Sequence, residues 1–208
     1  MWRSPKTIAF VWRELPHWEV EYGQYFVTVD LDGAIAKNIR EKICHIRKRL
    51  DAHKENRWLA IQRRVFTEME NWLHRADGVR FLADPRISEM LQEAIYYRNQ
   101  THIWHMKAYV IMPNHLHLFF GLGPAHHLIP VMDSFKQWTG RQANKVLGRS
   151  GRSFWQREWF DHWSRSSEED TRIIDYIRAN PVKAGLVQDS QLWIPSNWND
   201  PRFKRENR

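Results

Sequence analysis

Two histidines separated by a single apolar residue are the first candidates for chemistry in this sequence. His115 and His117 flank Leu116 in an apolar run that favours a β-strand. Because successive strand side chains point to opposite faces, both imidazoles should share one face while Leu116 points to the core. Two ring nitrogens on one face can bind a divalent cation. The same spacing is also common among histidines that only pack in a core or lie at a surface, so the pair alone does not establish a metal site.

A tyrosine and an asparagine four residues apart form a second candidate pair. Tyr176 and Asn180 occur in the segment Asp175-Tyr-Ile-Arg-Ala-Asn-Pro181, whose pattern predicts a helix. That spacing places a phenol and an amide oxygen on one side of the helix, separated by ~6 Å of rise. Two plainer interpretations stay open. Asn180 precedes a proline and could simply cap the end of the helix, and Tyr176 could be a half-buried amphipathic residue.

Together these four side chains match the needs of phosphodiester cleavage by a tyrosine. Two imidazoles and an amide oxygen would leave positions free on a bound cation, which could then polarise a phosphate oxygen. Because a free phenol has a pKa of about 10, it is a poor nucleophile until a metal or a basic group favours the phenolate. The pattern thus indicates a metal-assisted site with a tyrosine nucleophile.

The hydrophobic periodicity predicts the elements that must position these residues. Apolar runs predict strands over 25–30, 103–112 and 115–121 and in the second half of 154–165. Apolar residues at spacings of three and four predict helices over 35–50, 58–74, 85–97 and 128–147, and a last helix that Ser166 or Ser167 caps and Pro181 ends. This order predicts an α+β fold with an antiparallel sheet and helices packed on one face.

Length and charge bound the class of protein. With 208 residues, 42% of them hydrophobic, the chain can form one domain. We expect this domain over 17–200, with an N-terminal extension over 1–16, extra helices inserted after the first strand over about 34–100, and a basic tail over 201–208. The net charge of +8 favours a polyanionic partner, nucleic acid first, although such an excess can also serve solubility alone.

The cysteine content and the hydropathy indicate the compartment. Cys44 is the only cysteine, which excludes an internal disulfide and a cysteine-based zinc site and agrees with a reducing compartment. No run approaches the ~20 consecutive apolar residues that span a bilayer, and the first residues lack the apolar stretch of a signal peptide. We therefore expect a soluble, cytoplasmic protein without a membrane partner.

Four ordered motifs resemble those of one enzyme family. They are Ala108-Tyr-Val-Ile-Met-Pro-Asn-His-Leu-His-Leu118, Phe135-Lys-Gln-Trp-Thr-Gly-Arg-Gln-Ala-Asn144, Phe154-Trp-Gln-Arg-Glu-Trp-Phe-Asp161 and Tyr176-Ile-Arg-Ala-Asn-Pro-Val-Lys-Ala-Gly-Leu-Val187. The stretches His17-Trp-Glu-Val20 and Tyr25-Phe-Val-Thr28 are similar to the family's opening strand. The sequence thereby resembles the REP-associated tyrosine transposases, a branch of the single-tyrosine HUH transposases, over about residues 17–198.

The resemblance implies a fold, a metal site and a reaction. The fold would be the ferredoxin-like antiparallel sheet of HUH nucleases, and the cofactor Mg²⁺ or Mn²⁺. His115 and His117 match the family's metal-binding pair, Asn180 the polar residue that completes coordination, and Tyr176 the nucleophile. The implied activity is the cutting and rejoining of single-stranded or hairpin DNA through a 5′-phosphotyrosine, and the resemblance leaves a homodimer open.

The resemblance also implies DNA contacts, with one departure. The basic residues assigned to these contacts are Lys136, Arg141, Arg157, Arg165 and Lys183. Where the family carries Phe-Asp-Arg-x-x-Arg-Asp, this sequence reads Phe160-Asp-His-Trp-Ser-Arg-Ser166 and lacks one arginine and one aspartate. The departure puts DNA contacts in that region in doubt and leaves the four site residues intact.

Two rival functions fit parts of the sequence. The first is a non-catalytic protein, derived from such a transposase, that binds structured DNA or RNA. The second is a zinc hydrolase that joins the histidine pair to His102, His105 or His162, because neutral imidazole is a common zinc ligand. The zinc hydrolase gives no role to Tyr176 or to the basic charge.

Overall fold

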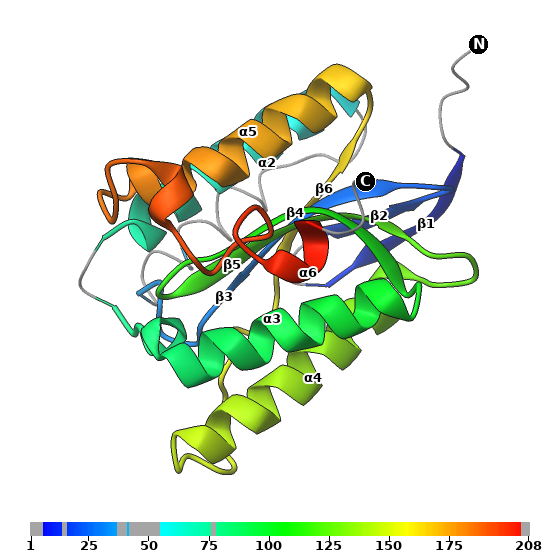
Figure 1. Ribbon diagram of the computed structural model, residues 1–208. Helices are drawn as coiled ribbons and strands as arrows, with labels where there is room; N and C mark the ends of the chain where they lie inside the picture. Colours follow the sequence, from blue (N-terminus) through cyan, green and yellow to red (C-terminus); the bar gives the residue numbers. More distant parts are fainter. Residues whose placement is uncertain (1–5, 14–15, 37–40, 42–54, 76–77, 205–208) are drawn as a thin grey trace.

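A computed structural model describes residues 6–13, 16–36, 41, 55–75 and 78–204, and shows a four-stranded sheet between two layers of helices (Figure 1). The strands are β1 (Thr7–Trp12), β2 (Pro16–Val20), β3 (Gln24–Asp30), β4 (Trp104–Ile111), β5 (His115–Leu122) and β6 (Phe160–Ser164). The helices are α2 (Glu55–Leu73), α3 (Pro85–Gln100), α4 (Leu128–Val146), α5 (Ser167–Lys183) and α6 (Pro201–Lys204), with short 3-10 turns η1 (Phe81–Ala83) and η2 (Ser190–Leu192). The helix predicted over 35–50 lies largely outside the described residues.

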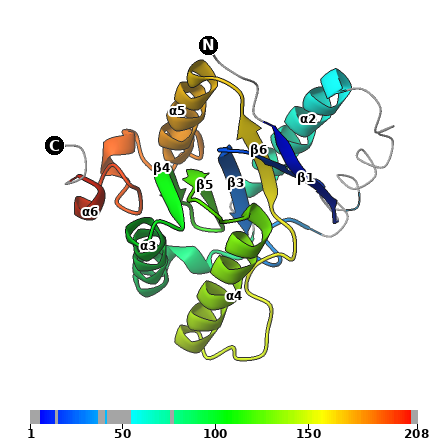
Figure 2. The same cartoon turned by 90° about the vertical axis from the view of Figure 1, so that its right-hand side faces the viewer.

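The central sheet has the strand order β4-β5-β3-β6, and every neighbouring pair is antiparallel. The α+β class and the antiparallel sheet are therefore as predicted. The expectation of helices on one face was wrong in detail, because α2 and α5 cover one face and α3 and α4 cover the other (Figures 1 and 2). The physical reason lies in the two central strands: Tyr25 to Asp30 and His115 to Gly121 are buried throughout, so both faces of these strands need a covering layer.

The β4–β5 hairpin sets the position of the histidine pair. Its connection, Met112 to Asn114, makes His115 the first residue of β5. The backbone N–H of Met112 donates to the carbonyl of His115 at 2.9 Å and closes the turn. Across the sheet, His117 is paired with Val110 on β4 and with Thr28 on β3. The pair thus lies on β5, a central strand, where the two neighbouring strands fix its orientation.

Helix α5 begins as predicted but extends past its predicted end. Ser166 caps it as predicted, with its side chain accepting from the N–H of Glu169. Pro181 does not end it, because the helix continues to Lys183 and the N–H of Ala184 still donates to the carbonyl of Asn180 at 2.9 Å. A proline removes one helical hydrogen bond, a loss that the last turn of a helix tolerates. Asn180 is therefore a buried residue inside the helix and no C-cap.

An N-terminal hairpin of β1 and β2 is joined to β6 by a buried histidine. His17 on β2 is 2% exposed, and its Nδ1 bonds the carboxylate of Asp161 while its Nε2 lies 3.0 Å from Glu158 Oε2. Its ring also stacks on Trp159, with centroids 4.5 Å apart. Part of the predicted N-terminal extension is thus ordered as β1. None of the described helices is both long and apolar enough to cross a membrane.

Candidate metal and tyrosine site

Helices α5 and α2 lie against the sheet face that carries the histidine pair. His115 and His117 point from β5 toward Tyr176 and Asn180 of α5, and all four predicted residues meet within one chain. Asn180 Nδ2 lies 3.2 Å from His117 Nε2, and the rings of His117 and Tyr176 are 5.5 Å apart. No second copy of the chain is needed to bring the tyrosine to the histidines.

The two imidazoles face each other through their Nε2 atoms. His115 Nε2 and His117 Nε2 are 3.1 Å apart, and both side chains are completely buried. Two nitrogens bound at ~2.1 Å to one cation, at about a right angle, would lie about 3 Å apart. Burial lowers the pKa of His117 to about 4 and that of His115 well below its ordinary value. Both rings are therefore neutral at physiological pH, the form in which imidazole binds metals.

Hydrogen bonds to the opposite ring nitrogens orient both rings. Asn114 Nδ2 donates to the carbonyl of Leu73 at 2.8 Å, so its Oδ1 faces His115 Nδ1 at 2.7 Å and accepts from it. Thr28 Oγ1 lies 2.9 Å from His117 Nδ1. With the Nδ1 atoms engaged in this way, the Nε2 lone pairs are directed into the site. Such outer hydrogen bonds are how proteins fix the orientation of metal-binding histidines.

A buried carboxylate, Glu70 on α2, completes the cluster and was missed in the sequence. Its Oε2 accepts from Tyr176 Oη and, at 3.2 Å, from Asn180 Nδ2. Its Oε1 lies 3.4 Å from His117 Nε2. His74, four residues further, places its Nε2 3.2 Å from the same carboxylate. The Glu-x-x-x-His spacing on a predicted helix was the available signal, since it puts both side chains on one face.

The environment of the site shifts the pKa values of Glu70 and Tyr176 in opposite directions. Burial alone would raise the pKa of Glu70, but the surrounding histidines and the tyrosine hydroxyl hold it well below its usual range. The hydrogen bond to Glu70 raises the pKa of His74. Burial, followed by the charge of Glu70, raises the pKa of Tyr176 far above its ordinary value. The arrangement therefore keeps the phenol protonated beside an ionised carboxylate.

The donor set of this cluster fits a divalent cation. Ligand atoms of Glu70, His74 and His115 all lie within 4.8 Å of one another. Among the described residues, Glu70 Oε1 and Asn180 Oδ1 are buried acceptors without a hydrogen-bond partner. Unpaired buried acceptors are costly, and a cation bound between them and the histidines would satisfy both. Residues that could hold it are His115, His117, Glu70, His74 and Asn180.

The basic residues assigned to DNA contacts are spread over the molecule. Lys183 lies at the site, its Nζ 4.9 Å from the centre of the Tyr176 ring. Arg165, on the loop between β6 and α5, packs its guanidinium 4.1 Å from the Trp163 ring. Arg141 is exposed on α4, on the far side of the sheet from Tyr176, and Arg157 is exposed before β6.

Lys136 is turned inward and is largely buried. Its Nζ donates to the carbonyl of Arg157 at 2.5 Å and lies 4.7 Å from the Trp159 ring. Burial lowers its pKa to about 8. The predicted DNA contact at Lys136 therefore has no support in this geometry. The residue instead ties α4 to the segment before β6, because a buried ammonium must find an acceptor.

The histidines of the zinc alternative lie elsewhere. His105 pairs with Gly121 at the opposite end of β5 from His115, and His102 lies beside His105. His162 on β6 binds Glu169 at 2.9 Å. None of the three reaches the histidine pair, so this form of the zinc hydrolase is contradicted. The third imidazole near the pair is that of His74.

Comparisons with known proteins agree with this fold. The family model described as "Transposase IS200 like" matches residues 79–180, a range that includes the histidine pair, Tyr176 and Asn180. Over that range the chain is similar to transposases of the IS200-like class.

The curated proteins that the chain is similar to include REP-associated tyrosine transposases, as the motifs predicted. The chain is 25% identical over 105 residues to the REP-associated tyrosine transposase of Escherichia coli (strain K12), which covers 50% of this chain and 61% of that relative. It is 31% identical over 101 residues to a protein of Haemophilus influenzae (strain ATCC 51907 / DSM 11121 / KW20 / Rd) provisionally assigned to the same transposases, covering 44% and 57% of the two chains. The matches thus span about three fifths of these relatives.

A solved structure shows the same fold. It is that of a REP-associated tyrosine transposase bound to a REP hairpin, and it superimposes with a TM-score of 0.53 at 19% identity, covering 85% of this chain and 77% of that one. The expected HUH nuclease fold is thereby confirmed.

Proposed function

We propose that this chain is a metal-dependent single-tyrosine transposase that cuts and rejoins structured single-stranded DNA. The observation that carries the proposal is the contact of Tyr176 and Asn180 with the histidine pair and Glu70 in one chain. The curated relatives are named transposases, and one of the solved relatives holds a REP hairpin. Both support hairpin DNA as the substrate class, with a net charge of +8 to attract it.

His115, His117 and Asn180 would hold Mg²⁺ or Mn²⁺, with Glu70 as an anionic ligand. A cation bound there would polarise a non-bridging phosphate oxygen. By neutralising the Glu70 carboxylate, it would also reduce the rise in the pKa of the Tyr176 phenol that this charge causes. Tyr176 Oη then forms a bond to phosphorus as the bond from phosphorus to the 3′ oxygen breaks. The phenol loses a proton and the leaving oxygen gains one, which gives a 3′-hydroxyl and a 5′-phosphotyrosine.

The reverse of this step explains rejoining. The phosphotyrosine keeps the energy of the phosphodiester bond, so a 3′-hydroxyl can attack it without any further energy source. Lys183, beside the tyrosine ring, is placed to favour the phenolate at each exchange.

The test is adduct formation on a hairpin oligonucleotide that carries single-stranded flanks, in the presence of Mn²⁺. We expect a covalent protein–DNA species with the wild type and none with Tyr176→Phe. Tyr97→Phe is the matched control, because Tyr97 is 63% exposed on α3 and equally loses a phenol hydroxyl. An adduct that persists in Tyr176→Phe would exclude the proposed nucleophile.

The alternative of a non-catalytic DNA- or RNA-binding relative is discriminated by the same assay. A binder without turnover would retain the hairpin and yield no metal-dependent nick. The unpaired buried acceptors of Glu70 and Asn180 favour the enzyme, since a protein that only binds DNA has no use for them.

A further inference from the structure

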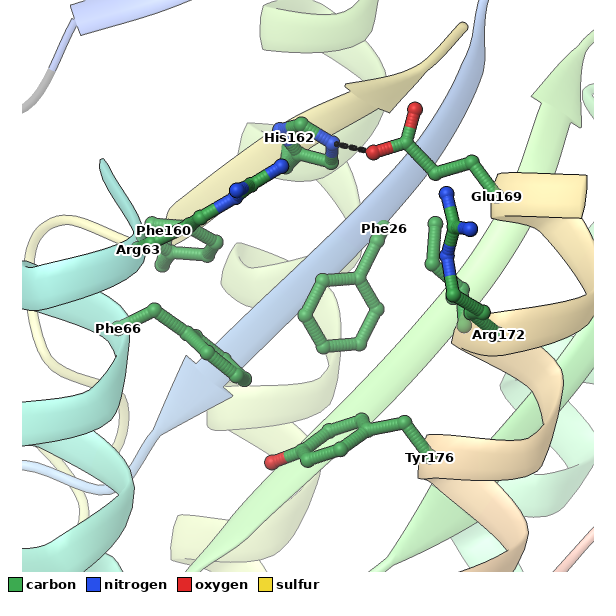
Figure 3. A pocket seen from close by; sticks show the side chains of 9 residues that line it. Phe26, Arg63, Phe66, Phe160, His162, Glu169, Arg172 and Tyr176 are labelled. Carbon is green, nitrogen blue, oxygen red and sulfur yellow. Dashed lines mark hydrogen bonds and ion pairs between the residues drawn. The ribbon is translucent and has the colours of Figure 1, made fainter. Parts of the chain in front are cut away.

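A cavity of about 530 Å³ opens directly beside Tyr176 (Figure 3). It lies between α2, α5 and the β3 and β6 edge of the sheet. Its volume falls within the ~300–1,000 Å³ of small-ligand sites. Tyr176 forms one wall, so whatever occupies the cavity lies next to the residue proposed to attack.

The floor of the cavity is aromatic. Phe26 from β3, Phe66 from α2 and Phe160 from β6 approach one another with ring centroids 5.0 to 6.4 Å apart. The Tyr176 ring packs edge-on against Phe26 at 5.8 Å and against Phe66 at 5.4 Å. Phe66 is only half-buried, so part of its ring is free to contact a ligand. Such a surface suits a flat apolar group.

Two arginines from opposite helices stand at the rim of the same cavity. Arg63 on α2 and Arg172 on α5 both line it, and both are exposed (Figure 3). Within the described part of the chain neither guanidinium donates a hydrogen bond, although the charge of Arg172 contributes to lowering the pKa of Glu168. The guanidinium fork matches the geometry of phosphate oxygens. The remaining polar groups, His162 and Glu169, bond each other at 2.9 Å.

We infer that this cavity binds one unpaired nucleotide adjoining the scissile phosphate, its base on the phenylalanine floor and its phosphate between Arg63 and Arg172. A purely apolar ligand would make no ion pair with the two guanidinium groups, and a free anion would make no stacking contact with the three phenyl rings. A base in a duplex is stacked on its neighbours and cannot lie on the floor. An unpaired nucleotide combines both chemistries, and stacking accepts any base.

The inference rests on the proposed function for the placement of that nucleotide and is tested by binding without cleavage. The probe is a fluorescent hairpin with a single-stranded flank, measured by anisotropy on metal-free Tyr176→Phe protein. A single abasic residue is moved along the flank. We expect one position, next to the phosphate that the wild type cuts, to weaken binding roughly 5- to 150-fold, the range for loss of one stacked base.

Variants of the protein test the same contacts by changing the cavity instead of the DNA. Phe66→Leu should weaken binding of the intact probe and abolish the difference between it and the abasic probe, while Phe66→Trp should retain that difference. Replacing both Arg172 and Arg63 by glutamine should lower the slope of log affinity against log salt by about 0.7, the change for one phosphate contact with a single strand, and each single replacement should give part of that change. The matched controls are Arg178→Gln and Arg64→Gln, on the same helices but outside the cavity. They should leave that slope unchanged.

The outcomes separate the two proposals. Equal binding of all abasic probes, with wild-type salt slopes in the arginine variants, would overturn the nucleotide cavity even if Tyr176 forms its adduct. A selective abasic position without any adduct in the wild type would support the cavity and refute the nuclease. Because the abasic change is made in the DNA, the result does not depend on how well a variant folds.

Discussion

Replacing Glu70 by glutamine removes the anionic ligand of the proposed cation and keeps the shape of the side chain. In the metal-free protein two effects oppose each other. Hydrogen bonds to a charged acceptor contribute about 1.5–3 kcal/mol each, and the bonds from Tyr176 and Asn180 weaken in Glu70→Gln. Desolvation of a carboxylate that is 7% exposed costs several kcal/mol, and the amide is spared that cost. We therefore expect a small change in the metal-free free energy of unfolding.

The effect on metal binding should be large. At a free Mn²⁺ concentration 100 times its Kd, binding stabilises the folded wild type by about 2.7 kcal/mol. A site change that weakens metal affinity ~10- to 100-fold reduces this to between about 1.4 and 0.4 kcal/mol. For a protein of this size each kcal/mol corresponds to about 2–4 °C in Tm.

The assay is thermal unfolding with and without Mn²⁺, together with calorimetric titration of the metal. Glu68→Gln is the control, because it lies on the same helix and outside the cluster. If Glu70→Gln kept the full Mn²⁺-induced rise in Tm, Glu70 would not be a ligand and the donor set given above would be wrong.

Further predictions concern pH, Lys183 and Thr28. Although burial opposes it, the two flanking carboxylates raise the pKa of His17 to about 9, so its contribution is complete below pH ~6.5 and is lost as pH rises through 9. Stability should therefore fall over that interval, by about 3 kcal/mol at most, and His17→Gln should flatten the pH profile of Tm. Lys183→Gln should slow single-turnover adduct formation at Tyr176 about 2- to 5-fold, the value of an exposed cation–π contact, and lower Tm by about 1–4 °C at most. Thr28→Val should weaken Mn²⁺ binding ~10- to 100-fold in titration by freeing the His117 ring; unchanged affinity would remove Thr28 from the support of that ring.

Local patterns predicted most of the fold. The apolar runs over 25–30, 103–112 and 115–121 predicted the strands that carry the site, and Ser166 predicted where α5 begins. The two-sided burial of the sheet was not predicted, because a continuous apolar run such as that of β5 fits a strand covered on one face or on both.

The candidate site was predicted as far as it depends on spacing within one element. The histidine pair is set by the alternation of a strand, and Tyr176 with Asn180 by one helical turn. Glu70 and Lys136 show the limit. Whether a charged side chain turns into the protein depends on which helix packs on it, and that contact joins residues far apart in the sequence. Glu70 was therefore missed, and Lys136 was assigned to a surface it does not reach.

The most direct test of the central claim is the identity of the DNA-linked amino acid. Wild-type protein is incubated with the hairpin oligonucleotide and Mn²⁺, digested with trypsin and nuclease, and analysed by mass spectrometry. Cleavage after Arg172 and Arg178 releases Ile173-Ile-Asp-Tyr-Ile-Arg178, which contains one tyrosine. We expect a nucleotide joined through its 5′ phosphate to Tyr176 in this peptide. Cut DNA with this peptide unmodified, or with the nucleotide on another residue, would contradict it.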